Sequence, residues 1–150
     1  MSPFATYPSL IDRHVFISGG ATGIGAALVE HFARQGGRVS FVDIDEANGK
    51  ALADALGVSR HQPQYVTCDV TDLAALKSAI DAARALHGPI GVLVNNAAND
   101  VRHAFDTTTP QHFDRNIAVN LRHHYFATQA VRDDMRQLGE GSVICLGSTG

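Results

Sequence analysis

The sequence predicts an α/β fold built on a doubly wound parallel sheet with helices on both faces. Short runs rich in β-branched residues alternate with longer segments of helical periodicity, a pattern typical of βαβ units. A glycine-rich turn directly follows the first of these runs, as in parallel sheets that bind a ligand at the carboxyl ends of their strands. The 150 residues, 45% hydrophobic and 18% charged, suffice for one domain with one core.

Five buried strands are predicted, at residues 14–18, 38–43, 63–68, 91–95 and 142–147. Cys68 and Cys145 both fall in these apolar runs. We therefore expect both cysteines to be small buried hydrophobes, without a disulfide or a reactive thiol.

Segments of helical periodicity separate the strands, and their apolar stripes are expected to face the sheet. The stripes are Ile24, Leu28 and Phe32, and Leu73, Leu76, Ile80 and Ala83. Asp72 marks a helix start, and Gly36 and Gly88 mark helix ends. The longest helical stretch spans residues 110–138, with an imperfect apolar face formed by Phe113, Ile117, Leu121 and Phe126.

Charge and composition narrow the class of partner. The formal net charge is −3 and the sequence has no dense basic run, so neither nucleic acid nor an anionic membrane is expected as a partner. The first residues carry Pro3 and Pro8 before any apolar run, which fits neither a signal peptide nor a membrane span. These observations predict a cytoplasmic protein that acts on small molecules.

The glycine-rich turn, SGGATGIG at residues 18–25, links the first strand to the first helix. Glycines at this spacing let the backbone approach a pyrophosphate, whose charge is stabilised by free N–H groups and the positive helix end. An isolated glycine cluster could equally be a flexible turn. Here a strand, the turn, a helix and a second strand follow in order, which indicates dinucleotide binding.

Asp43 ends the second predicted strand, twenty residues beyond Gly23. A carboxylate at this place can accept hydrogen bonds from both adenosine ribose hydroxyls and would repel a 2′-phosphate. Neither Ile44, Asp45 nor the glycine turn supplies a positive charge. The sequence therefore favours NAD over NADP, with capping of the next helix as the alternative role for Asp43.

Further motifs connect the glycine turn to a known family. They are SGGATGIG at 18–25, CDV at 68–70, NNAA at 95–98, Asn120 within VNLRHHYF, and LGS at 146–148. With these motifs, essentially the whole chain resembles the N-terminal part of the short-chain dehydrogenase/reductase family. The resemblance implies a Rossmann-like doubly wound sheet whose first five strands lie here, so that residues 1–150 form a dinucleotide-binding domain that is incomplete at its C-terminus.

The resemblance also implies which residues bind the cofactor NAD. They are Ser18, Gly19, Gly23, Ile24, Gly25, Asp43, Asp69, Val70, Asn96 and Ala97. Ser18 stands where the family usually has Thr, which keeps a hydroxyl, and Ala98 replaces a usual glycine. Asn95 is expected to brace the central sheet. Capping or turn roles are the alternatives for Asp69 and for the asparagine pair.

Asn120 and Ser148 are the expected catalytic residues. Asn is a poor residue for a helix interior, and the resemblance implies that Asn120 interrupts the helix and holds a water for proton relay. It also implies that Ser148 orients the substrate oxygen. Ser148 is not expected to be a nucleophile, because GSTG at 147–150 lacks the G-x-S-x-G spacing. A solvent-facing asparagine and an ordinary loop serine are the alternatives.

The reaction of the family needs a tyrosine as general acid/base, whose pKa is lowered by a lysine four residues later. None of Tyr7, Tyr65 and Tyr125 has this spacing to Lys50 or Lys77. We therefore expect the catalytic Tyr and Lys to lie beyond Gly150, and residues 1–150 alone to be inactive. A noncatalytic dinucleotide-binding regulator is the alternative.

The substrate expectation rests on AANDVRH at 97–103 and on the residues after Asn120. They resemble bacterial NAD-dependent aldose 1-dehydrogenases, which oxidise xylose, galactose or arabinose. This resemblance implies hydride transfer from the anomeric carbon of an aldose to NAD, with Asn99 and Ser148 binding the substrate. Amide, carboxylate, guanidinium and imidazole groups suit a polyhydroxylated ligand. The alternatives are another alcohol or keto-acyl dehydrogenase of the family and, for the segment itself, a solvated loop.

No metal site is expected. His123 and His124 are adjacent on a helix, so their side chains point about 100° apart, and His103 and His112 have no partner acid at a telling spacing. Hydride transfer to nicotinamide needs no metal. The family commonly forms dimers or tetramers through the long helix and the one after it, so a homo-oligomer is expected for the full-length protein.

Overall fold

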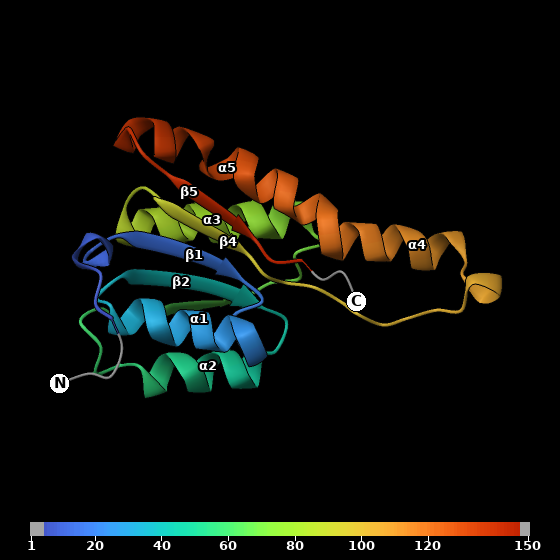
Figure 1. Ribbon diagram of the computed structural model, residues 1–150, viewed down its shortest axis with the longest axis horizontal. Helices are drawn as coiled ribbons and strands as arrows, with labels where there is room; N and C mark the ends of the chain where they lie inside the picture. Colours follow the sequence, from blue (N-terminus) through green and yellow to red (C-terminus); the bar gives the residue numbers. More distant parts are fainter. Residues whose placement is uncertain (1–4, 148–150) are drawn as a thin grey trace.

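The computed structural model describes residues 5–147 and confirms the doubly wound fold (Figure 1). Its sheet has five strands in the order β3-β2-β1-β4-β5, and every neighbouring pair is parallel. The strands are β1 (His14–Ser18), β2 (Arg38–Asp43), β3 (Gln64–Thr67), β4 (Val92–Asn95) and β5 (Ser142–Cys145). The predicted strands are therefore confirmed to within two residues at each end.

The helices alternate with these strands. They are α1 (Gly23–Arg34), α2 (Glu46–Ala55), α3 (Leu73–His87), α4 (Pro110–Ile117) and α5 (His123–Leu138), with short 3-10 turns η1 (Pro8–Leu10) and η2 (Phe105–Thr107). Asp72 caps α3, since its carboxylate accepts the N–H groups of Ala74 and Ala75 at 3.0 Å each. Gly36 and Gly88 follow α1 and α3 with φ of 83° and 82°, which confirms the predicted helix ends.

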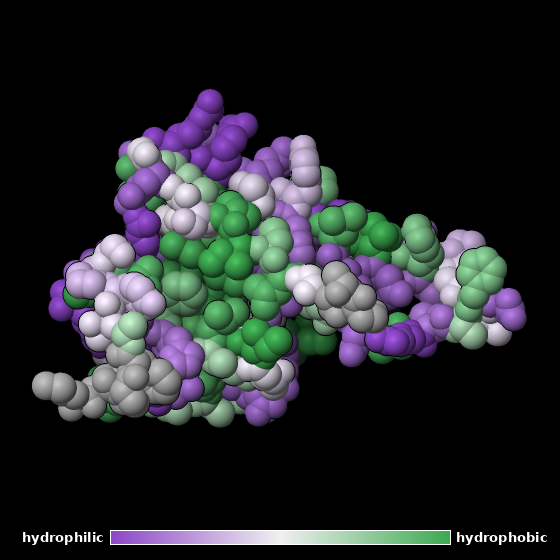
Figure 2. All heavy atoms as spheres, in the orientation of Figure 1, coloured by the Kyte–Doolittle hydropathy of each residue, from purple (hydrophilic) through white to green (hydrophobic). Residues whose placement is uncertain are grey.

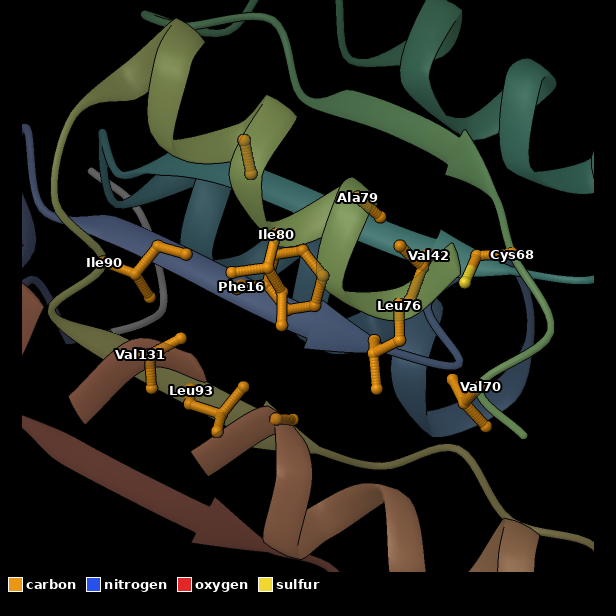
Figure 3. Close-up of a cluster of buried hydrophobic side chains, with 12 residues drawn as sticks. Phe16, Val42, Cys68, Val70, Leu76, Ala79, Ile80, Ile90, Leu93 and Val131 are labelled. Carbon is orange, nitrogen blue, oxygen red and sulfur yellow. The ribbon is translucent and has the colours of Figure 1, made fainter. Parts of the chain in front are cut away.

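Helices lie on both faces of the sheet, so β1, β2 and β4 bury apolar side chains on both faces, although all four residues of β5 are exposed. Successive side chains of a strand point to opposite faces. In β1, Phe16 belongs to the core shared with α3 and α5, whereas Val15 and Ile17 belong to the core shared with α1 and α2. Figure 3 shows Phe16 beside Ile80 of α3, with Val131 of α5 on the same face.

The predicted helix over residues 110–138 is interrupted between α4 and α5 by a π-helical segment, η3 (Ala118–Arg122). A π turn holds an extra residue, which rotates the following helix relative to the preceding one. The side chains of α5 that are buried are His123, Ala127, Val131 and Asp134. The predicted apolar face does not pack on the sheet, because Phe113, Ile117, Leu121 and Phe126 are all exposed.

Two smaller expectations are wrong. Ile24 is 67% exposed, because the buried stripe of α1 consists of Gly25, Val29 and Ala33. Cys145 is also exposed, whereas Cys68 is buried. Cys145 lies on the outer strand of the described sheet, and all four residues of β5 are exposed.

The surface carries apolar side chains in two places (Figure 2). They gather over the strands in the middle of the face shown and on α4, which extends beyond the sheet in Figure 1. Exposed apolar residues include Val143 and Ile144 of β5 and Phe113 of α4. Within residues 5–147, no helix has the length and hydropathy needed to cross a bilayer.

Candidate active site

A cleft of about 780 Å³ lies at the carboxyl ends of β1, β2 and β4. In a doubly wound sheet this is the expected place for a ligand, because the chain leaves β1 and β4 toward opposite faces of the sheet. Every residue predicted to bind the cofactor, except Ser18, lines this cleft. The predicted substrate-binding residue Asn99 lines it as well.

The floor of the cleft is the glycine turn, packed directly against the segment after β4. Gly19 has φ of 70°, and a Cβ there would lie 2.7 Å from the Cα of Ala97. A Cβ on Gly25 would overlap the carbonyl oxygen of Gly19. No side chain fits at either position. The Thr22 side chain does not cap α1, so the N–H groups of the first turn are left for a ligand anion.

Asp43 lies at one end of the cleft and connects the glycine turn to β2. Its Oδ2 accepts the N–H of Ala21 at 2.9 Å, and its Oδ1 accepts the N–H of Asp45 at 3.1 Å. The residue that caps α2 is Asp45, whose carboxylate accepts the N–H of Asn48 at 3.1 Å. The alternative that Asp43 caps the next helix is therefore wrong, and its carboxylate remains on the cleft wall.

The end of β3 supplies Cys68, Asp69 and Val70 to the same wall. Asp69 Oδ1 accepts hydrogen bonds from the backbone N–H and the hydroxyl of Thr71, at 2.9 and 2.7 Å. These bonds hold the pKa of Asp69 below its usual value, and the charge of Arg115 acts in the same direction. Arg115 reaches the cleft from α4 and is the one cation among the described residues that line it. Arg115 is not among the residues predicted from the sequence, because its place at the cleft depends on the long loop between β4 and α4.

Ser18 lies behind the cleft wall. It is 1% exposed, and its Oγ accepts the N–H groups of Asn96 and Ala97 at 3.1 Å each. In return, Asn96 Nδ2 donates to the carbonyl oxygens of Ser18 and Gly19, at 3.1 and 2.7 Å. The ends of β1 and β4 are thus joined by side-chain hydrogen bonds beyond the last pair of the ladder. Ser18 positions the cleft and does not form its surface.

A second cavity of about 720 Å³ adjoins the first, with which it shares Ala98, Asn99 and Asp100. Its polar lining includes Asn99, Asp100, Arg102, His103, Thr108, Asn116, Asn120 and His124. Leu146 and Gly147 form another part of its wall. Ser148, the predicted substrate-orienting residue, directly follows Gly147 and lies outside the described residues.

Asn120 occupies the π-helical segment η3, so the helix is interrupted where the resemblance implied. Its side chain is exposed but also forms two hydrogen bonds with the backbone of Asn99. Oδ1 accepts the N–H of Asn99 at 2.7 Å, and Nδ2 donates to the carbonyl oxygen of Asn99 at 2.9 Å. Asn120 therefore holds the loop after β4 at the junction of the two cavities.

The histidines near this site pair with one another. His123 and His124 lie edge to face, with ring centroids 4.3 Å apart, and His103 and His112 are stacked at 4.0 Å. Across residues 5–147, no three His, Cys, Asp or Glu residues are grouped so that they could hold a metal ion. His123 is fully buried and was not predicted from the sequence to belong to the site.

Known proteins are similar to this chain in sequence. Residues 13–150 match the family model described as short chain dehydrogenase. The chain is 46% identical over 144 residues to a D-xylose 1-dehydrogenase of Caulobacter vibrioides, a match that covers 96% of this chain and 56% of that protein. It is 44% identical over 143 residues to a probable galactose dehydrogenase of Rhizobium meliloti, covering 95% and 56%.

A solved structure is similar in fold as well. A metagenomic short-chain oxidoreductase in complex with NADP superposes with a TM-score of 0.88 at 27% identity, covering 95% of this chain and 65% of that one. The chain thus spans about half the length of the curated relatives it matches.

Proposed function

This chain belongs to the short-chain dehydrogenase family, and we propose that it is the N-terminal part of an NAD-dependent sugar dehydrogenase. The observation that carries the proposal is the cleft at the carboxyl ends of β1, β2 and β4, in which the glycine turn and Asp43 lie together. When bound, NAD would supply the hydride acceptor. The residues of this chain bind it and position the substrate.

The cleft fits a dinucleotide. The glycine turn packs so closely that no side chain fits at Gly19 or Gly25, and the N–H groups at the start of α1 would bind a pyrophosphate. Val70 and Asp69 would border the adenine, and Ile24 the nicotinamide side, as the family resemblance implies. Arg115 would add a positive charge to a cleft that otherwise holds Asp43, Asp69 and Asp100.

Asp43 supports NAD as the cofactor. Its carboxylate lies on the wall of the cleft and is already held in place by the N–H groups of Ala21 and Asp45. Such a fixed charge can accept hydrogen bonds from ribose hydroxyls and repels a 2′-phosphate. The NADP bound by the structural relative described above belongs to that protein. For the protein that contains this chain, the test is a direct comparison of its affinities for NAD and NADP.

An aldose is the proposed substrate. The second cavity presents amide, carboxylate, guanidinium and imidazole groups, which can bond the many hydroxyls of a sugar. The two curated relatives are named for galactose and for D-xylose. We propose that the sugar lies in this cavity with its anomeric carbon toward the first cleft. Ser148 would orient its oxygen, and a Tyr beyond Gly150 would take the proton.

The experiment uses the full-length protein that contains this chain. We expect reduction of NAD with D-xylose, D-galactose or L-arabinose, and much slower reduction of NADP. Simple secondary alcohols and keto-acyl substrates form the second arm of the panel. Activity on these and on no sugar would overturn the aldose assignment, and absence of any nucleotide binding would overturn the function altogether. The polypeptide 1–150 serves as the inactive comparison, because it lacks the Tyr-x-x-x-Lys pair.

We further propose that the full-length protein is a homo-oligomer. The exposed apolar side chains of the α4 to α5 region support this proposal, since Phe113, Leu121 and Tyr125 are 59%, 59% and 67% exposed. Sedimentation analysis of the full-length protein should give a mass of at least two copies. A monomer at micromolar concentration would contradict it.

A further inference from the structure

His123 is the largest buried polar side chain near the cleft that the proposed function does not use. It begins α5 and is 0% exposed. Its ring touches two groups that belong to different parts of the site. Nε2 lies 3.2 Å from the hydroxyl oxygen of Ser18 at the end of β1, and Nδ1 lies 2.5 Å from the carbonyl oxygen of Val119 in η3.

The hydrogen atoms of this arrangement can be assigned by counting donors and acceptors. Ser18 Oγ accepts the backbone N–H groups of Asn96 and Ala97, which uses both of its lone pairs. Its own proton is then left for His123, so Nε2 must be an unprotonated acceptor. Nδ1 carries the ring proton, because its partner is a carbonyl oxygen, which can only accept.

The π-helical segment explains why this carbonyl is within reach. In an α-helix, the backbone N–H of His123 would pair with the carbonyl of Val119, four residues earlier. Here the N–H of His123 donates to the carbonyl of Ala118, five residues earlier. The wide turn thereby offers the Val119 carbonyl to the His123 ring. The same segment carries Asn120, which holds the loop at Asn99.

We infer that His123 is a positioning residue of the cleft: its neutral ring fixes the hydroxyl of Ser18 and ties the end of β1 to the π-helical segment. Ser18 in turn fixes the backbone of Asn96 and Ala97, which lines the cleft. The effect on dinucleotide affinity rests on the proposed function, whereas the hydrogen-bond assignment does not. His123 touches neither cofactor nor substrate and acts only through Ser18 and Val119.

Burial agrees with a neutral ring. Removal from water and, to a smaller extent, the neighbouring His124 lower the pKa of His123, and the bond to the Val119 carbonyl raises it, so that the net pKa is about 4. His124 lies edge to face against His123, with centroids 4.3 Å apart. A charged ring would also place a second N–H against a hydroxyl whose lone pairs are already used.

Two variants of the full-length protein separate a positioning role from mere packing. His123→Gln places an amide oxygen near Nε2, where it can accept the Ser18 proton. His123→Leu fills the space without polar atoms and leaves Ser18 unpaired. We expect the dissociation constant for NADH to rise roughly tenfold for His123→Leu, and to stay within about threefold of wild type for His123→Gln. His61→Gln is the matched control and should bind NADH as wild type does, because His61 is half-buried beside Asp12 and does not line the cleft.

The tautomer gives a direct second readout. Nitrogen-15 chemical shifts of the His123 ring at pH 7 should show Nδ1 protonated and Nε2 free. A ring protonated at Nε2 would overturn the inference, as would wild-type affinity in His123→Leu or equal loss in both variants. If His123→Leu does not fold, His123→Gln and the ring shifts decide. If the wild type binds no NADH, the proposed function fails, and the ring shifts still decide the hydrogen-bond assignment.

Discussion

Asn120 pairs with the backbone of Asn99 as one peptide group pairs with another across a sheet. Its Oδ1 accepts the Asn99 N–H at 2.7 Å, and its Nδ2 donates to the Asn99 carbonyl oxygen at 2.9 Å. The two residues are 21 positions apart and lie on η3 and on the loop after β4. The side chain therefore fixes the place where the first cleft meets the second cavity.

Replacement of Asn120 by Ala in the full-length protein removes both bonds. Each contributes about 1 kcal/mol, so we expect the KM for the sugar to rise roughly tenfold or more. The relay role implied by the family predicts a lower kcat in addition, whereas the loop role alone predicts a change in KM. Steady-state kinetics separates the two. Asn48→Ala, which also loses a surface hydrogen bond, is the control. An unchanged KM would refute the loop role.

Asp43→Asn tests cofactor choice. The substitution keeps an oxygen that can accept the N–H of Ala21 or Asp45 and removes the charge that repels a 2′-phosphate. We expect NAD affinity to fall roughly tenfold, because hydrogen bonds to charged groups contribute about 1.5–3 kcal/mol, and NADP affinity to rise. Fluorescence titration with both reduced cofactors measures the ratio. Asp54→Asn on α2 should leave the ratio of NAD to NADP affinity unchanged. The prediction fails if Asp43→Asn also leaves this ratio unchanged.

Gly25→Ala tests the close approach of the glycine turn. The added methyl would overlap the Gly19 carbonyl oxygen, so the backbone must move. We expect the free energy of unfolding to fall by about 1–3 kcal/mol and the affinity for NADH to fall with it. Gly147→Ala is the control for stability, because a Cβ there would meet no atom of residues 5–147 within 4 Å. Equal stability of the two variants, measured by urea unfolding, would contradict the steric argument.

We expect the protein to lose stability in mild acid, because His14 and His123 are buried. Burial is the main cause that lowers the pKa of His14 and of His123 to about 4, from the ordinary histidine value of about 6.5. Between these values the unfolded chain binds protons that the folded protein does not. The contribution of each neutral histidine to the free energy of unfolding is therefore complete above pH 6.5. It falls by about 1.4 kcal/mol per pH unit for each histidine as the pH drops toward 4. Burial also lowers the pKa of His87 and of His124, so these two histidines contribute to the same loss of stability.

Urea unfolding between pH 7 and pH 4 measures this slope. His14→Gln should reduce it, because the amide can still bond Ser40 or the Gly88 carbonyl without titrating. The surface carboxylates act at lower pH, since hydrogen bonds from Arg60 and His61 lower the pKa of Asp12 to about 2. A free energy of unfolding that stays constant from pH 6.5 to pH 4 would show that both rings are protonated in the folded protein.

The strands and the cleft could be predicted from the sequence because local patterns determine them. Buried parallel strands need continuous apolar runs, and the turn at Gly19 and Gly25 needs residues without a Cβ. The place of Asp43 on the cleft wall could be predicted because it is the last residue of β2. These features depend on neighbours in the chain, and the structure confirms the sheet that they imply.

The remaining features depend on contacts between distant segments. The extra residue in η3 sets which face of α5 is buried, the one that begins with His123, and no periodicity in a helix of standard pitch indicates that shift. Arg115 reaches the cleft only because α4 lies across from β3. Cys145 lies in an apolar run, yet its burial depends on what lies beside the outer strand. For such residues, the sequence pattern does not predict which segments will lie beside them, and it therefore does not predict their burial.

The pairing of β1 with β4 brings Ser18 beside Asn95, across 77 positions of the chain. The walls of the cleft therefore do not exist until this long-range pairing has formed, and a partly folded chain with only β1, β2 and β3 has no complete binding site. A ligand of the cleft then binds the folded state alone and shifts the folding equilibrium by mass action. A saturating ligand of the cleft should therefore raise the free energy of unfolding and slow proteolysis of the purified protein.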